Sequence, residues 1–158
     1  MKANQNIVML GIGNVGRQDD GLGWKFLEKI KNSKCFTGKA HYRYQLNVED
    51  ADAIKDADRV FVIDAYKGQL ENGFIVEPCL PNGSFEFTSH ALQPEAVLAL
   101  CQKLYKKHPK MCKVKIQGFE WKLKEGLTEQ AQQNLTKAIE FFGALEEMEC
   151  VENLEVCS

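Results

Sequence analysis

The sequence predicts an α/β protein with a single-domain, three-layer fold, in which helices flank both faces of a mostly parallel twisted sheet of about five strands. Strand-like and helix-like segments alternate along the chain, with no linker, repeat or low-complexity tract between them. The segment 59–64 (RVFVID) is nearly all apolar, as is typical of a central parallel strand covered on both faces. A chain of 158 residues fits one domain and can bury a real core. We therefore expect one domain over residues 1–158.

The first half of the chain carries three predicted strands and two predicted helices. The apolar run 7–10 predicts a strand, and apolar residues at helical spacing over 24–30 predict the helix that follows. A second extended stretch covers 40–46 and a short helix covers 49–55. The apolar segment 59–64 is the third strand.

The second half continues the alternation. A strand over 74–77 is expected to lie beside the third strand, and the stretch 80–89 reads as an irregular or hairpin-like segment. A helix begins at Pro94, a last strand covers 114–119, and a closing helix begins at Thr128, which can cap it. Four apolar residues of the closing helix are expected in the core: Ala131, Leu135, Ile139 and Phe142.

Charge and hydropathy argue against two classes of protein. With 20 basic against 22 acidic side chains, the formal net charge is −2, so there is no electrostatic basis for nucleic-acid binding. No apolar stretch approaches the roughly 20 residues that span a bilayer, and the opening MKANQN lacks the apolar core of a signal peptide. We expect a cytoplasmic protein that binds neither nucleic acid nor membrane.

Six cysteines are scattered along the chain without a C-x-x-C pair. In a chain of ordinary apolar content this spacing favours reduced thiols over a disulfide framework, and it argues against a structural zinc cluster. A catalytic thiol is the weaker interpretation, because no cysteine lies in a predicted loop beside a likely base.

The segment 11–23 (GIGNVGRQDDGLG) lies between the first strand and the first helix. Its glycines match the dinucleotide fingerprint G-x-G-x-x-G. However, Asp19 and Asp20 lie where such a loop holds a pyrophosphate, which their charges would repel. The acidic residue expected about 20 residues further on is replaced by Gln45 and Asn47. A nucleotide-binding module therefore remains an alternative, and an oxygen ligand for a cation is the other chemical interpretation.

Both carboxylates also have an ordinary structural explanation. An Asp before an apolar run usually caps the helix that follows, and two carboxylates at a helix N-terminus suit its dipole. Taken alone, Asp19 or Asp20 is better explained as a helix cap.

Three residues from separate parts of the chain are expected at one edge of the sheet. Asp64 ends a buried strand, Asp20 follows the first strand, and His90 lies in a loop just before a helix. In doubly wound sheets the carboxyl edge carries the ligand crevice. Two carboxylates and an imidazole suit Ni, Zn or Fe(II) better than Mg or Ca. Taken singly, Asp64 as a turn residue and His90 as a cap or surface residue are the simpler explanations.

At these residues the chain resembles the NiFe-hydrogenase maturation endopeptidases, the peptidases that process the C-terminus of the hydrogenase large subunit. The resemblance covers nearly the whole chain in order and spacing, and four motif blocks carry it. They are G-x-G-N with D-[DE]-x-x-G at Gly11, Gly13, Asn14, Asp19, Asp20 and Gly23; a buried strand ending in D-A at Asp64 and Ala65; [ST]-[ST]-H at Thr88, Ser89 and His90; and G-L-[ST] at Gly126, Leu127 and Thr128.

The resemblance implies a specific reaction. Such peptidases remove a short C-terminal extension from the NiFe-hydrogenase large-subunit precursor after nickel insertion, so that the nickel in the substrate is the recognition element. The cut follows a His or Arg a few residues beyond a Cys ligand of the nickel. Carried over to this chain, the metal contacts are Asp20, Asp64 and His90, and another divalent cation could occupy them in the apo enzyme.

The cleavage chemistry has two possible forms. A bound ion could polarise the scissile carbonyl or activate a water, or a carboxylate could act as general base. Asp20 is the first candidate for the catalytic base. Asp19 is the weaker candidate and better explained as a supporting or capping group, while Asn14 is expected to brace the glycine turn.

The chain departs from the family pattern in three places. Residues 44–47 (YQLN) lack the acidic or glycine-rich feature of some members, 119–124 (FEWKLK) is longer and more charged than expected, and 146–158 matches no motif and is expected to be a flexible tail. Two alternatives stay open: a non-catalytic nickel-binding accessory protein of the same fold, and a Rossmann-like nucleotide-binding module.

Overall fold

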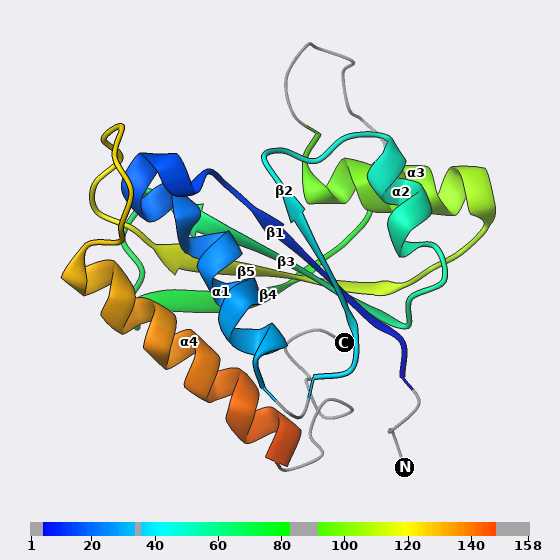
Figure 1. Cartoon of the computed structure of the whole chain (residues 1–158). Helices are drawn as coiled ribbons and strands as arrows, with labels where there is room; N and C mark the ends of the chain where they lie inside the picture. The colour runs from blue at the N-terminus through cyan, green and yellow to red at the C-terminus, as the bar shows by residue number, and fades with distance from the viewer. Residues whose placement is uncertain (1–4, 34–35, 83–91, 148–158) are drawn as a thin grey trace.

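The computed structural model describes residues 5–33, 36–82 and 92–147 (Figure 1). Its elements run in the order β1 (Ile7–Ile12), the 3₁₀ segment η1 (Val15–Gly21), α1 (Leu22–Lys31), β2 (Lys39–Arg43), α2 (Glu49–Ile54), β3 (Arg59–Tyr66), β4 (Phe74–Cys79), α3 (Pro94–Tyr105), β5 (Lys110–Gln117) and α4 (Glu129–Glu147). Within these described residues, no helix has the length and apolar character needed to cross a membrane.

The five strands form one sheet in the order β2-β1-β3-β5-β4. Strands β2, β1, β3 and β5 are parallel, and β4 is antiparallel to β5. The expectation that 74–77 lies beside the third strand is therefore wrong, since β5 lies between β3 and β4. Pro78 explains why β4 suits the sheet edge, because a proline cannot donate a hydrogen bond to a ladder on both sides.

Helices cover both faces of the sheet, which confirms the predicted three layers. Helices α1 and α4 lie on one face, and α2 and α3 lie on the other (Figure 1). Successive side chains of the central strand β3 alternate between the two faces of the sheet. Phe61 and Ile63 pack towards α1 and α4, whereas Val60 and Val62 pack towards α2 and α3. This double coverage is why the segment 59–64 is almost continuously apolar.

The helix starts follow the predicted signals. Pro94 occupies the first turn of α3, and the N–H of Ala131 donates to Thr128 Oγ1 at 3.2 Å, so Thr128 caps α4. Along α4, the ring of Phe142 packs edge-on against Phe26 and Phe61, with centroids 5.3 and 5.2 Å apart. Of the four predicted core residues of this helix, three are buried and Ile139 is partly buried.

Two strands are shorter at the carboxyl edge than predicted. Strand β2 ends at Arg43, so residues 44–46 leave the sheet, and β5 ends at Gln117, which leaves Phe119 outside it. The N–H of Gly118 donates to the carbonyl of Tyr66 as the chain turns away. Both departures place loops at the edge where the candidate site lies.

The cysteine prediction holds only in part. Cys79 and Cys101 are free and buried, whereas Cys112 is disulfide-bonded. Sequence spacing excludes only local pairs, and it says nothing of cysteines that the fold brings together from distant segments. The predicted tail 146–158 overlaps the last residues of α4, and the rest of it lies outside the described residues.

Candidate metal-binding active site

The candidate site lies where the strand order of the sheet reverses. The chain passes from β1 outwards to β2 and then returns to β3 on the other side of β1. In open α/β sheets, ligands bind outside the carboxyl ends of the strands at such a point. Asp20 follows β1, and Asp64 lies near the end of β3, so the fold brings both predicted ligands to this edge.

The glycine loop folds back on itself rather than around a ligand. Gly13, at φ +140°, presses against the carbonyl of Asp20, and a Cβ at this position would overlap that oxygen. The N–H of Asn14 donates to the same carbonyl at 3.1 Å, and Asn14 Oδ1 accepts from the N–H of Gly16 at 2.8 Å. Asn14 therefore braces the turn, as predicted, and the loop fixes the backbone of Asp20.

The amide groups of this loop are already used. Those of six residues donate to protein acceptors: Gly13, Asn14, Gly16, Arg17, Gln18 and Asp19. A phosphate-binding loop needs such groups free to point at the ligand. The geometry therefore argues against the nucleotide-binding alternative.

Asp19 ties the loop to a distant segment of the chain. Its carboxylate is fully buried and accepts hydrogen bonds from the N–H groups of Phe119, Glu120 and Thr128 and from the hydroxyl of Thr128, at 2.7 to 3.1 Å. Both oxygens are occupied, so Asp19 supports the structure and is not placed to act as a base. The capping explanation is wrong for α1, whose N-cap is Gly21 without a side-chain hydrogen bond.

Gln18 adds to this attachment. It takes up a positive φ of 49°, its N–H donates to the carbonyl of Lys124, and its side-chain oxygen accepts from the N–H of Lys122. The charged segment 119–124, which departs from the family pattern, is thus hydrogen-bonded directly to the acidic loop.

Asp20 is partly exposed, and its pKa is raised. Burial is the main cause, and it is opposed by the Asn14 backbone hydrogen bond and by the positive charges of Lys67 and Arg17. A carboxylate whose charged form is disfavoured is a typical functional group in a cleft.

Asp64 is more strongly perturbed. Its pKa is raised to about 7, chiefly by burial; a hydrogen bond from the N–H of Ala65 at 2.8 Å opposes the rise, and the nearby charge of Asp20 adds to it. The two carboxylates therefore lie close enough to repel each other. A cation between them would relieve both the repulsion and the desolvation, so the donors fit a bound divalent metal.

The third predicted ligand, His90, lies outside the described residues, together with Thr88 and Ser89. Within the part of the chain that is described, no group of three or more His, Cys, Asp or Glu side chains could hold an ion. The structure therefore brings together Asp20 and Asp64, and the role of His90 stays a prediction.

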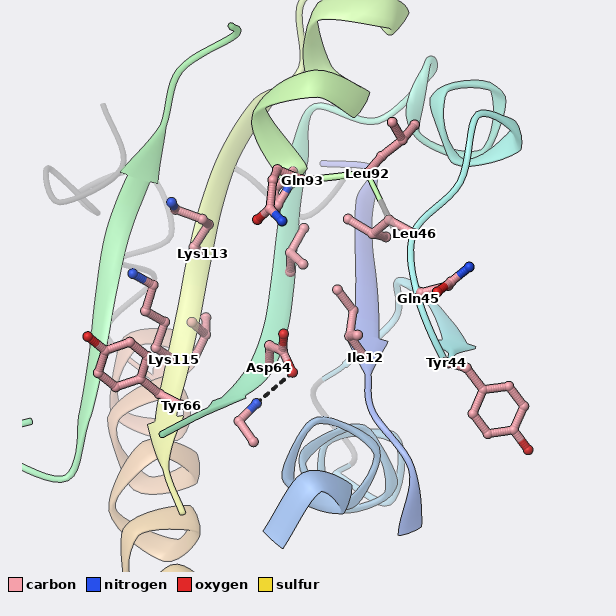
Figure 2. Close-up of a pocket in the computed structure, with 14 residues that line it drawn as sticks. Ile12, Tyr44, Gln45, Leu46, Asp64, Tyr66, Leu92, Gln93, Lys113 and Lys115 are labelled. Atoms are coloured by element: carbon pink, nitrogen blue, oxygen red, sulfur yellow. Dashed lines mark hydrogen bonds between the residues drawn. The ribbon is translucent and has the colours of Figure 1, made fainter. Parts of the chain in front are cut away.

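A pocket of about 400 Å³ opens beside Asp64 on the α3 face of the sheet (Figure 2). The segment 44–46, the ends of three strands and the start of α3 line it. The lining includes the side chains of Asp64, Tyr66, Lys113 and Lys115, which bring a carboxyl, a phenol and two ammonium groups to the pocket. Sequence reasoning missed the two lysines, although their alternation in the strand KMCKVKIQ marks one face of β5 as polar at this end.

The chain has the fold of solved hydrogenase maturation endopeptidases, which confirms the resemblance at the level of the fold. The hydrogenase maturating endopeptidase HybD from E. coli matches over 90% of this chain and 93% of its own, with a TM-score of 0.69 and 18% identity. The [NiFe] hydrogenase maturation protease HycI from Thermococcus kodakarensis KOD1 matches over the same shares, with a TM-score of 0.68 and 22% identity.

A third structure, the endopeptidase HycI from Escherichia coli, gives a TM-score of 0.66 at 18% identity over 89% of this chain and 91% of that one. No family model matches the sequence, and no curated protein sequence does. The likeness of this chain to these proteins is therefore a likeness of fold, at sequence identities of 18 to 22%.

Proposed function

We propose that this protein is a cytoplasmic endopeptidase that removes the C-terminal extension of a NiFe-hydrogenase large-subunit precursor after nickel insertion. One observation carries the proposal. Asp20 and Asp64, both with a raised pKa, meet at the reversal point of a fold whose solved relatives are named hydrogenase maturation proteases. The precursor is the proposed partner, and its nickel is the recognition element.

Asp20, Asp64 and His90 are the proposed contacts to that nickel, and another divalent cation could bind them in the apo enzyme. The mixed oxygen and nitrogen donors suit a nickel ion. Because Asp20 and Asp64 repel each other without a cation, the site favours substrate that carries its metal over substrate that lacks it. Cleavage is thereby coupled to nickel insertion.

Asp20 is the proposed general base. It is the more exposed of the two carboxylates, its raised pKa makes it a better proton acceptor, and its backbone is fixed by Gly13 and Asn14. It would take a proton from the attacking water and return it to the leaving amide nitrogen. Asp64 then serves as a metal contact and Asp19 as structural support.

The test compares nickel-loaded and nickel-free precursor. Each is mixed with the purified protein, and the precursor mass is followed. Loss of a C-terminal peptide from the loaded sample alone supports the proposal. The variants Asp20→Asn, Asp64→Asn and His90→Gln should stay folded and stop processing. Wild-type rates in all three would refute the site assignment.

The alternative is a non-catalytic nickel-binding accessory protein. It shares the predicted metal contacts and differs only in leaving the precursor intact. Nickel binding without any change in precursor mass would favour it.

A further inference from the structure

Lys115 lies directly beside Asp64 in the sheet but does not pair with it. The two are register partners on the parallel strands β3 and β5. Neighbouring strands lie about 4.8 Å apart and partners of this kind present their side chains on one face, so a lysine side chain can reach the carboxylate. Among the described residues, Asp64 nevertheless forms no salt bridge, and its hydrogen bond comes from the N–H of Ala65.

Lys115 is held on its other side. Its Nζ lies 2.8 Å from Glu77 Oε1 on β4 and 5.2 Å from the centroid of the Tyr66 ring. Lys113, two residues earlier on the same face, binds Glu95 of α3 at 2.5 Å and lies 3.8 Å from Glu77. Figure 2 shows both lysine side chains extending from β5 away from Asp64.

These ion pairs contribute little to stability. The side chains of Lys115 and Glu77 are 31% and 32% exposed, and pairs at such exposure have small net energies. What the pairs do fix is where the two ammonium groups lie. Both lysines are paired with glutamates, and among the described residues the Asp64 carboxyl is left without an ion-pair partner.

We infer that Glu77 is a positioning residue that holds Lys115 away from Asp64 and so keeps this carboxylate open to a divalent cation. The inference rests on the proposed function, because it assigns Asp64 as a metal contact. With Glu77 neutralised, Lys115 loses its ion-pair partner, and its register partner on the neighbouring strand is Asp64. An ammonium paired there would have to be displaced before a metal could bind.

The test measures Ni²⁺ binding by isothermal titration calorimetry, with nickel chloride and the full chain. Glu77→Gln should weaken Ni²⁺ binding roughly 10-fold or more, as is typical when the support of a ligand is lost. Adding Lys115→Met in the same chain should restore wild-type affinity, because the competing ammonium is gone. Glu95→Gln is the matched control: it removes the same charge from the same group of ion pairs, but the lysine that loses its partner is Lys113, which is not the register partner of Asp64.

Three results with the variants would overturn the inference. The first is an unchanged Ni²⁺ affinity in Glu77→Gln, and the second is a loss of affinity that Lys115→Met does not restore. The third is an equal loss of affinity in Glu95→Gln, which would mean that the net charge alone causes the effect. A wild-type protein that binds no Ni²⁺ would refute the metal contact itself, and the positioning role with it. A crystal structure of Glu77→Gln supplies an independent readout, since it should show Lys115 Nζ within 4 Å of an Asp64 oxygen.

Discussion

Asp64 should make the protein less stable as the pH rises. Its carboxyl has a pKa of about 7 in the folded state, against 3.8 for an aspartate free in water. Between these values the unfolded chain releases the proton and the folded chain keeps it, so unfolding becomes easier as the pH increases. The full penalty is about 4 kcal/mol, reached above pH 7, and about 2–3 kcal/mol of it develops between pH 5 and pH 8.

Asp64→Asn isolates this effect. The amide cannot ionise, and its oxygen can still accept the hydrogen bond from the N–H of Ala65. We expect urea unfolding in the presence of a chelator to show the variant gaining on the wild type by about 2–3 kcal/mol between pH 5 and pH 8. The difference between the two proteins cancels the titration of the shared groups that do not interact with Asp64; Asp20 does interact with it.

An exposed carboxylate provides the control for sign. The pKa of Asp52 is lowered, chiefly by its hydrogen bond with Lys55, so Asp52→Asn should lose stability relative to the wild type as the pH rises through the range where Asp52 ionises. If the gap between wild type and Asp64→Asn stays constant from pH 5 to pH 8, the carboxyl of Asp64 titrates as it does in water. The description of the site as a desolvated carboxylate pair would then be wrong.

Three further predictions concern the support of the site and the core. Asp19→Ala should cost about 3–5 kcal/mol in urea unfolding, because it leaves four part-buried donors of the 119–128 segment without their acceptor; a loss below 1 kcal/mol would contradict this. Gly13→Ala should lower the rate of precursor cleavage roughly 100-fold by displacing the backbone of Asp20. Gly126→Ala, also at positive φ but with open space around it, should leave that rate near wild type. Phe142→Ala should cost about 3–5 kcal/mol in thermal or urea unfolding, whereas Phe119→Ala, at a partly exposed position, should cost much less.

The strands and helices were predictable because their signals are local. The apolar run of β3, the proline at the start of α3 and the threonine cap of α4 act within a few residues of the chain. The position of β4 was not, since strand order depends on which edges remain free after β1, β3 and β5 have paired.

Some residues of the candidate site were likewise predictable from local signals, and others were not. Asp64 could be named because it ends an apolar run, and Asp20 because it lies in the loop that follows one; the carboxyl ends of parallel strands meet at one edge of the sheet. A supporting role for Asp19 was predicted, but its partners could not be, because the groups it binds lie about a hundred residues away along the chain. The role of Lys115 depends on the register between β3 and β5, which no local pattern specifies.

The attachment of Asp19 to Thr128 also bears on when the protein becomes competent during synthesis. The acidic loop is made early, but the donors that hold it are made 100 to 109 residues later. Contacts of such long separation form late, after the intervening chain has been ordered. A nascent or truncated chain that stops before residue 119 therefore carries both site carboxylates without the segment that fixes them, and activity should be acquired only once the last third of the chain has folded.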